Sequence, residues 1–340
     1  MVDPDQPRPT DHQGAAQQPR AITAVVDVET GQGGSAGRDQ FGPATLDSGL
    51  TALGASLRQE RSAVSRITSL RPSTGPSLRQ RLQAQLSAPL PEQPELVLVT
   101  DLDGTLLGGS LAERRRFYAW LAQQRARVLQ VFCTGRDLGS VARLLVEDEH
   151  VGLRAPHLVI GDVGCTVACG ASLEPLPLAV APIEARWQGK SDRVLAVMAG
   201  AAGISAQPIS SQRRLAYYYD PESFDHGLIA ELEAHGVDCL LSDNRYLDVL
   251  PAGVNKGSTL QALVHALEID PALVVTAGDT LNDLAMFETG LAGVMVGNAE
   301  PALRAEAHRL RRTYVARSPG CEGICEGLHH FGFGHLLPQR

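Results

Sequence analysis

Lysine is nearly absent from this chain. Lys190 and Lys256 are its only two lysines, and arginine supplies the other 28 of the 30 basic residues. Lysine presents a compact ammonium, whereas arginine presents a planar fork that is always charged. A chain with this bias is expected to keep lysine where arginine would not serve. Lys256 stands at the start of a predicted helix and is a candidate for such a role, whereas Lys190 is given none.

Long apolar runs and a secretion signal are also missing. No uninterrupted apolar segment approaches the ~18 residues that a membrane-spanning helix needs, and the first residues do not show a basic region followed by an apolar one. We therefore expect a cytoplasmic protein that does not act at a membrane. The net charge of -8 argues against nucleic-acid binding, which usually requires a basic face.

The six cysteines include no C-x-x-C pair. Cys165 and Cys169 have three residues between them, as do Cys321 and Cys325. In a long chain of this kind that spacing is only a weak indication of metal binding. We interpret the cysteines as buried or unreactive thiols.

Residues 1–92 differ in composition from the rest of the chain. Pro, Gln, Gly, Ser and Thr dominate most of this stretch, and such a composition buries too little apolar surface to offset the entropy of ordering. We expect a disordered N-terminal extension. Residues 50–70 contain enough Leu, Ala and Arg to form a helix that docks on a partner.

The most informative segment is Leu96–Leu106. Its first apolar residues predict a buried parallel strand, which ends at Asp101 and Asp103, followed by the turn residue Gly104. Ligands bind at the carboxyl ends of strands in open parallel sheets, and two neighbouring carboxylates need a cation or a proton to coexist. A catalytic pair is one interpretation, and a strand followed by an ordinary Asp/Gly turn is the other.

Three further segments carry polar residues at the ends of predicted elements. They are Thr134–Arg136 after a second apolar strand, Lys256 at the start of a helical pattern, and Asp279 and Asp283 after a third strand. Each has an ordinary explanation when taken alone, as a helix cap, a solvated lysine or acids in a first helical turn. All of these coincidences in one chain are improbable, so the set predicts a catalytic site.

Strand and helix patterns alternate from residue 96 onward, which implies parallel strands with helices on both faces. We therefore expect an α/β fold with a doubly wound, mostly parallel sheet. About 120 residues separate Thr134 from Lys256, several times the length of one β-α-β unit of about 30 residues. We expect an inserted α+β cap domain at 166–251 and a catalytic core at 93–165 and 252–340.

In their order and on the expected elements, the four segments resemble the motifs of the haloacid dehalogenase (HAD) superfamily of phosphohydrolases. The insertion lies where members with a type C2 cap carry theirs. The segments Ala216–Pro221, Asp248–Pro251 and Gly293–Ala299 are similar to those of the sucrose-phosphate phosphatase family. The resemblance spans Leu96 to the C-terminus and implies a HAD-like Rossmannoid core that hydrolyses phosphate esters.

The resemblance also implies roles. Asp101 is expected to be the nucleophile that forms an aspartyl-phosphate, and Asp103 the general acid and base. The phosphoryl group would be bound by Thr134, Gly135, Arg136 and Lys256. A magnesium ion would be held by Asp101, the backbone carbonyl of Asp103 and Asp279, with Asp283 holding a metal-bound water or orienting a ligand.

A phosphorylated sugar is the substrate that the resemblance implies, in the form of a disaccharide or glycosyl-polyol phosphate. Cap residues expected to contact the sugar are Gln212, Tyr217, Asn244 and Arg245. Gly161–Thr166 and Ser318–Gly323 depart from the family's pattern, so sucrose, mannosylfructose and glycosylglycerol phosphates all stay open. The alternatives are a phosphatase of a simpler monosaccharide, polyol or other small metabolite, and a catalytically silent scaffold whose N-terminal extension recruits a glycosyltransferase.

Overall fold

The computed structural model describes residues 75–209 and 211–338. Most of the extension expected at 1–92 lies outside these residues, and so does the helix predicted at 50–70. The helices that matter below are α2 (Leu78–Gln83), α3 (Leu111–Gln123), α4 (Leu138–Glu147), α5 (Pro177–Trp187), α6 (Ser191–Met198), α7 (Gly227–Glu233), α8 (Lys256–Ala266), α9 (Leu284–Phe287), α10 (Pro301–Glu306) and α11 (Gly320–His330).

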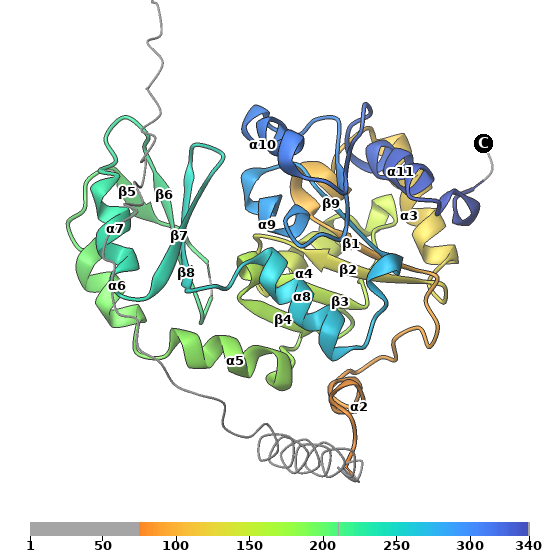
Figure 1. The fold of residues 1–340 in the computed structure, drawn as a ribbon, viewed down its shortest axis with the longest axis horizontal. Helices are drawn as coiled ribbons and strands as arrows, with labels where there is room; N and C mark the ends of the chain where they lie inside the picture. Colours follow the sequence, from red (N-terminus) through yellow and green to blue (C-terminus); the bar gives the residue numbers. More distant parts are fainter. Residues whose placement is uncertain (1–74, 210, 339–340) are drawn as a thin grey trace, which may run out of the picture. The chain divides into compact units, whose positions relative to one another are not determined.

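A seven-stranded sheet lies at the centre of the larger part of the described structure (Figure 1). Its strands, in spatial order, are β11 (Thr313–Val315), β10 (Ala292–Met295), β9 (Val274–Gly278), β1 (Leu96–Thr100), β2 (Val128–Cys133), β3 (Leu158–Gly161) and β4 (Thr166–Cys169). Neighbouring strands are parallel except β4, which runs antiparallel to β3. The predicted α/β fold with a mostly parallel sheet is confirmed.

Alternation along β1 sends its side chains to two separate cores, because successive residues of a strand point to opposite faces. Leu98 belongs to a cluster that contains Trp120 of α3 and Ile324 of α11. Val99 belongs to another cluster, together with Leu260 of α8. Helices therefore cover both faces of the sheet, and all five residues of β1 are buried.

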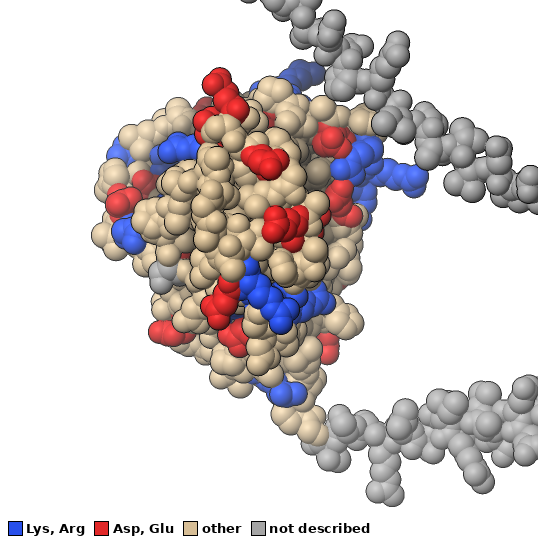
Figure 2. Space-filling view, turned by 90° about the vertical axis from the view of Figure 1, so that its left-hand side faces the viewer, with Lys and Arg blue, Asp and Glu red and all other residues tan. Residues whose placement is uncertain are grey.

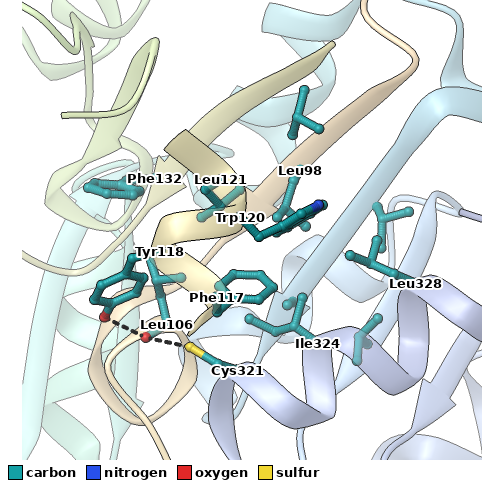
Figure 3. Packing of buried hydrophobic residues seen from close by; sticks show 14 of the residues in the cluster. Leu98, Leu106, Phe117, Tyr118, Trp120, Leu121, Phe132, Cys321, Ile324 and Leu328 are labelled. Atoms are coloured by element: carbon teal, nitrogen blue, oxygen red, sulfur yellow. Dashed lines mark hydrogen bonds between the residues drawn. The ribbon is translucent and has the colours of Figure 1, made fainter. Parts of the chain in front are cut away.

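Helices α3 and α11 fix the loop that follows β1 (Figure 3). The carbonyl of Leu106 accepts a hydrogen bond from the Tyr118 hydroxyl at 2.9 Å and another from the Cys321 thiol at 3.2 Å. Phe117 packs beside them in the same cluster. The end of the first motif is thus held from two helices that are far apart in sequence.

A separate four-stranded antiparallel sheet forms the predicted cap insertion. Its spatial order is β5 (Ile204–Ala206), β6 (Leu215–Tyr219), β8 (Tyr246–Pro251) and β7 (Val237–Ser242). One face packs against α6 and α7, because Leu247 and Val249 share a cluster with Val194 and Leu232. Helix α5 packs against both the large sheet and the cap sheet, because Val180 lies in a cluster of the large sheet and Trp187 lies in the cap cluster.

Two boundaries differ from the expectation. Strand β4 extends the large sheet through a tight β3–β4 hairpin, so Thr166–Cys169 lies in the core sheet and not in the cap. Within residues expected to be disordered, α2 forms because Ser77 and Gln80 make a reciprocal capping box. Its Leu82 is buried in the cluster shared with α5 and α8.

None of the helices within 75–209 and 211–338 is long and apolar enough to cross a bilayer. On the cap face shown in Figure 2, acidic and basic side chains are interspersed among neutral ones and form no continuous basic strip. Four cysteines are buried: Cys133, Cys165, Cys169 and Cys321.

Candidate active site

The candidate site lies where the strand order of the large sheet reverses. Strand β1 has β2 on one side and β9 on the other, and this is the place where open α/β sheets bind ligands. In the pairing register, Thr100 lies opposite Phe132 of β2 and Ala277 of β9. The residues that follow these strands, among them Asp101, Thr134 and Asp279, therefore meet at one edge.

Lys256 is the centre of the site. It is fully buried, and its ammonium donates to Asp101 Oδ1 at 2.7 Å, to Asp283 Oδ1 at 2.6 Å and to Asn282 Oδ1 at 2.6 Å. All three ammonium protons are thus used. The residue is placed at the start of α8 by Asn255, which forms a capping box with Ser258.

Asp283 also orders the loop after β9. Its second oxygen accepts from the backbone N–H of Asp279 at 2.9 Å and of Thr280 at 3.1 Å. The Asp279 carboxylate in turn accepts from the Thr105 hydroxyl at 2.8 Å. Asp283 therefore positions both Lys256 and Asp279.

Gly104 leaves the space that Asp279 occupies. Its φ is +77°, and a Cβ placed there would lie 2.0 Å from Asp279 Oδ2. The backbone at this point approaches the carboxylate more closely than any side chain would permit, and its left-handed conformation also favours glycine. The Gly104 carbonyl is fixed by Asn298 Nδ2 at 2.9 Å.

Burial governs the electrostatics of these groups. It raises the pKa of Asp101 well above its usual value, against the lowering effect of Lys256. Burial, together with Asp283, raises the pKa of Asp279 to about 7. Burial alone would lower the pKa of Lys256, but Asp101 and Asp283 raise it above its usual value, so the ammonium stays protonated.

The carboxylates fit a divalent cation. Oxygens of Asp101, Asp279 and Asp283 lie within 4.8 Å of one another, and carboxylate oxygens are the ligands that hard cations such as Mg²⁺ prefer. Against these three carboxylates stands one ammonium, that of Lys256. The donor set is therefore suited to a cation that offsets the excess negative charge.

Asp103 does not join this group. Its carboxylate forms a two-point ion pair with Arg136, at 2.7 and 2.6 Å, and the Asp103 side chain is 62% exposed. Its predicted role as a metal ligand concerned the backbone carbonyl and stays a prediction. The pair links the loop after β1 to the loop after β2.

The loop Thr134–Arg136 is held by its backbone. Thr134 is fully buried, and its hydroxyl accepts from the Arg136 N–H at 3.1 Å. The carbonyls of Thr134 and Arg136 accept from the N–H groups of Val163 and Asp162, at 3.1 and 2.9 Å. The loop after β3 therefore fixes the predicted phosphoryl-binding segment.

The cap candidates lie in different places. Tyr217 is buried in the cap cluster beneath α6 and α7, because alternation along β6 puts Tyr217 on that face and Tyr218 on the opposite one. Gln212 is exposed and lines a surface hollow with Glu184 and Trp187.

Asn244 and Arg245 are exposed in the β7–β8 turn. The Arg245 guanidinium lies 5.1 Å from the ring centre of Tyr218 and 5.5 Å from that of Tyr246. No role was predicted from sequence for Thr105, Asn282 or Tyr218. Thr105 lies within Leu96–Leu106 and Asn282 lies between Asp279 and Asp283, and this position inside the motifs is the signal that could have identified them.

The fold and this site define a phosphohydrolase of the HAD type. Residues 94–332 match the family model described as sucrose-6F-phosphate phosphohydrolase, so the chain belongs to that family. Its predicted place among the sucrose-phosphate phosphatases is thereby confirmed.

Individual relatives differ in what they are named for. The chain is 40% identical to a glucosylglycerol-phosphate synthase of Pseudomonas anguilliseptica over 70% of its own length, but that match spans only 31% of the synthase. It is 34% identical to a mannosylfructose-phosphate phosphatase of Agrobacterium fabrum, over 71% of this chain and 98% of that protein.

A solved structure shares the fold. The sucrose-phosphatase of Synechocystis sp. PCC6803, in complex with sucrose and phosphate, has a TM-score of 0.63 and 27% sequence identity with this chain. The match covers 70% of this chain and 98% of the other.

Proposed function

We propose that the protein hydrolyses the phosphate monoester of a disaccharide or glycosyl-polyol through an aspartyl-phosphate on Asp101. The observation that carries this proposal is the buried ammonium of Lys256, which contacts both Asp101 and Asp283 at the strand-order reversal. A phosphoryl group seated against Asp101 would meet this positive charge in a site removed from water, where it is most effective.

The chemistry proceeds in two displacements. An Asp101 oxygen attacks phosphorus, and the P–O bond to the sugar breaks while the departing oxygen takes a proton from the Asp103 carboxyl. Water then attacks the aspartyl-phosphate and gives a proton to the Asp103 carboxylate, which releases inorganic phosphate and regenerates Asp101. Lys256, the Thr134 hydroxyl and the Gly135 amide stabilise charge on the phosphoryl oxygens.

Magnesium is the cofactor that we propose. Asp101, the backbone carbonyl of Asp103 and Asp279 would hold it, and Asp283 orients the site from behind through its contacts with Lys256 and Asp279. When bound, a divalent cation neutralises charge on the phosphoryl oxygens. Arg136 holds Asp103 and lies beside the phosphoryl-binding residues.

The substrate that we favour is a glycosylglycerol phosphate or a related disaccharide phosphate. Support comes from the relatives named for glucosylglycerol phosphate and mannosylfructose phosphate, at 40% and 34% identity. Tyr218, Tyr246 and Arg245 offer rings and a cation on the cap, groups suited to sugar faces and hydroxyls. Hydrolysis of simpler monosaccharide or polyol phosphates is the alternative.

A panel of phosphate esters tests this proposal. Purified protein is supplied with Mg²⁺ and with glucosylglycerol, mannosylfructose, sucrose, glucose or glycerol phosphate, and phosphate release is measured. We expect release from one of the glycosyl-linked esters that stops with chelator and in the Asp101→Asn variant. Release only from glucose or glycerol phosphate would favour the alternative, and release that survives Asp101→Asn would refute the mechanism.

We also infer that a glycosyltransferase supplies the substrate. In the Pseudomonas relative, a segment similar to this chain is part of a longer protein named as a synthase. An interaction through the N-terminal extension, whose residues 1–74 lie outside the described structure, would bring two such activities together here. Co-purification of the transferase with the full chain, and its loss when residues 1–74 are removed, tests the interaction.

A further inference from the structure

A cap residue reaches into the phosphoryl-binding loop. Arg214 precedes β6, and its side chain is 4% exposed. Its guanidinium donates to Asp248 Oδ1 of β8 at 2.6 Å, to Asp162 Oδ1 at 3.2 Å and to the carbonyl oxygen of Gly135 at 2.7 Å. One buried cation therefore joins the cap sheet, the loop after β3 and the loop after β2.

The contact with Gly135 completes a set. The carbonyls on either side, those of Thr134 and Arg136, accept from the backbone N–H groups of Val163 and Asp162. Arg214 supplies the donor for the middle carbonyl. Three consecutive carbonyls of the loop are thus held by hydrogen bonds, and the middle one is held by the cap.

Fixing the Gly135 carbonyl also fixes the next N–H, because both belong to one planar peptide unit. That N–H, of Arg136, donates to the Thr134 hydroxyl at 3.1 Å. A hydroxyl has one proton to donate, and an oxygen that accepts from Arg136 directs its own proton elsewhere. The chain of contacts therefore runs from Arg214 to the hydroxyl that is expected to bind a phosphoryl oxygen.

Two buried carboxylates hold the Arg214 guanidinium in place. Asp162 and Asp248 have side-chain exposures of 5% and 7%, and both face the same guanidinium. Asp162 also accepts from the Thr166 hydroxyl at 2.7 Å, and it has a φ of +54°, a left-handed conformation that costs free energy for a non-glycine residue. The surroundings hold the arginine fork in one orientation.

We propose that Arg214 is a positioning residue that couples the seating of the cap to phosphoryl binding. With the cap in place, Arg214 holds the Gly135–Arg136 peptide and so aims the Thr134 hydroxyl. This rests on the proposed function, since it assigns the regulation of that same site to a residue outside the motifs. Arg214 itself does not touch the reacting atoms.

Arg213 provides a matched control. Its side chain is 7% exposed, and it donates to the Cys165 carbonyl at 2.9 Å, to Glu184 Oε1 at 2.8 Å and to the Thr166 hydroxyl at 3.3 Å. It joins the cap to the same β3–β4 hairpin as Arg214 does. None of these contacts is with residues 134–136.

The test compares Arg214→Gln with Arg213→Gln. Steady-state kinetics on the cleaved sugar phosphate, inhibition by inorganic phosphate and the thermal midpoint are measured for each. We expect kcat/KM to fall about 10- to 100-fold in Arg214→Gln, because small misplacements of a binding group cost this much. The inhibition constant for phosphate should rise in parallel, whereas Arg213→Gln should leave it within about twofold of the native value.

Arg214→Gln leaves the buried carboxylates of Asp162 and Asp248 without a cation, which can destabilise the fold. Arg214→Lys is therefore included as a second variant, to separate a folding defect from a loss of positioning. Lysine keeps the charge but not the fork. We expect this variant to fold and still to bind phosphate poorly. Native phosphate inhibition in Arg214→Lys, or equal losses in the two glutamine variants, would overturn the proposal.

The outcome is separable from that of the proposed function. If the native protein releases phosphate from no ester, the function fails. Protection of the native protein and its variants from thermal unfolding by inorganic phosphate then still decides the role of Arg214. Equal protection of Arg214→Gln and the native protein would overturn it.

Discussion

Arg136 engages both carboxylate oxygens of Asp103, with Nε 2.7 Å from Oδ2 and Nη2 2.6 Å from Oδ1. Because the Asp103 side chain is mostly exposed, solvent weakens the contribution of this pair to stability. Its consequence is chemical: the group expected to give and take protons is held by a fork that fixes both of its oxygens. Each Asp103 oxygen keeps a second lone pair that Arg136 does not use, and a proton for the sugar would be carried there.

The first prediction concerns this pair. Arg136→Lys removes the two-point hold, so we expect kcat for the sugar phosphate to fall about tenfold. With p-nitrophenyl phosphate, whose leaving group needs no proton, kcat/KM should be unchanged, because it reports only the formation of the aspartyl-phosphate. A rise in KM for both substrates would instead show that Arg136 mainly binds the phosphoryl group.

The second prediction uses the two lysines. Lys256→Arg forces a larger cation into a fully buried position between Asp101 and Asp283, and activity should fall by about 10²-fold or more. Lys190→Arg is the control, since Lys190 lies in the cap and donates to the His235 carbonyl at 3.0 Å. Phosphate release by the control should match the native rate, and wild-type activity in Lys256→Arg would contradict the site.

The third prediction separates backbone strain from contact. Gly104 and Gly290 have φ values of +77° and +79°, but only at Gly104 would a Cβ meet Asp279, while nothing lies within 4 Å of one at Gly290. Alanine at either position should cost about 1 kcal/mol in free energy of unfolding from the left-handed conformation. Only Gly104→Ala should also lose phosphate release, as kinetics and chemical denaturation would show together.

The fourth prediction compares two aspartates without metal. In chelator at pH 8, Asp279→Asn removes one of three crowded carboxylates and should raise the free energy of unfolding by about 1 kcal/mol. Asp283→Asn leaves one acceptor oxygen in place of two, so it cannot keep both the contact with Lys256 and the contacts to two backbone N–H groups. This variant should lower the free energy of unfolding. Added Mg²⁺ should raise the thermal midpoint of the native protein but not of Asp279→Asn.

The fifth prediction concerns acid stability. His157 is buried, its Nδ1 accepts from the Gln130 N–H at 3.0 Å, and burial lowers its pKa to about 4. Below pH 6.5 the unfolded chain binds a proton that the folded chain does not, so stability is present above 6.5 and is lost as pH falls towards 4. The loss reaches up to about 3 kcal/mol. His157→Asn keeps an acceptor without a titrating ring, and urea unfolding at several pH values should show a smaller slope.

The motif residues were predictable because the strand patterns place them at the ends of strands, and parallel strands end at the same edge of a sheet. A strand ending at Asp101 and another ending at Asp279 must meet at one edge of a parallel sheet, and the register brings them there. The helix start at Lys256 was likewise visible in Asn255 and Ser258. Sequence pattern was therefore sufficient to predict the site residues that lie at the end of a strand or the start of a helix.

The cap was less predictable for two physical reasons. Tyr217, Tyr218 and Tyr219 are three like residues in a row, so the alternation of β6 has no visible phase, and only the packing of α6 and α7 decides which face is covered. Arg214 is one arginine among 28, and burial between two aspartates is a property of the folded chain. Helix α2, by contrast, had a readable signal in the capping pair Ser77 and Gln80.

The contacts of α2 and of the last described residues have a practical consequence for the choice of limits when this chain is shortened. The family model matches residues 94–332. Outside this range, Leu82 is buried against the core, and the carbonyl of Leu336 accepts a hydrogen bond from the Trp120 indole at 2.6 Å. A chain cut at residues 94 and 332 would expose the apolar surface that Leu82 covers and would leave the Trp120 indole N–H without its acceptor. A shortened chain should therefore keep α2 and Leu336, which lie outside the segment that the family model matches.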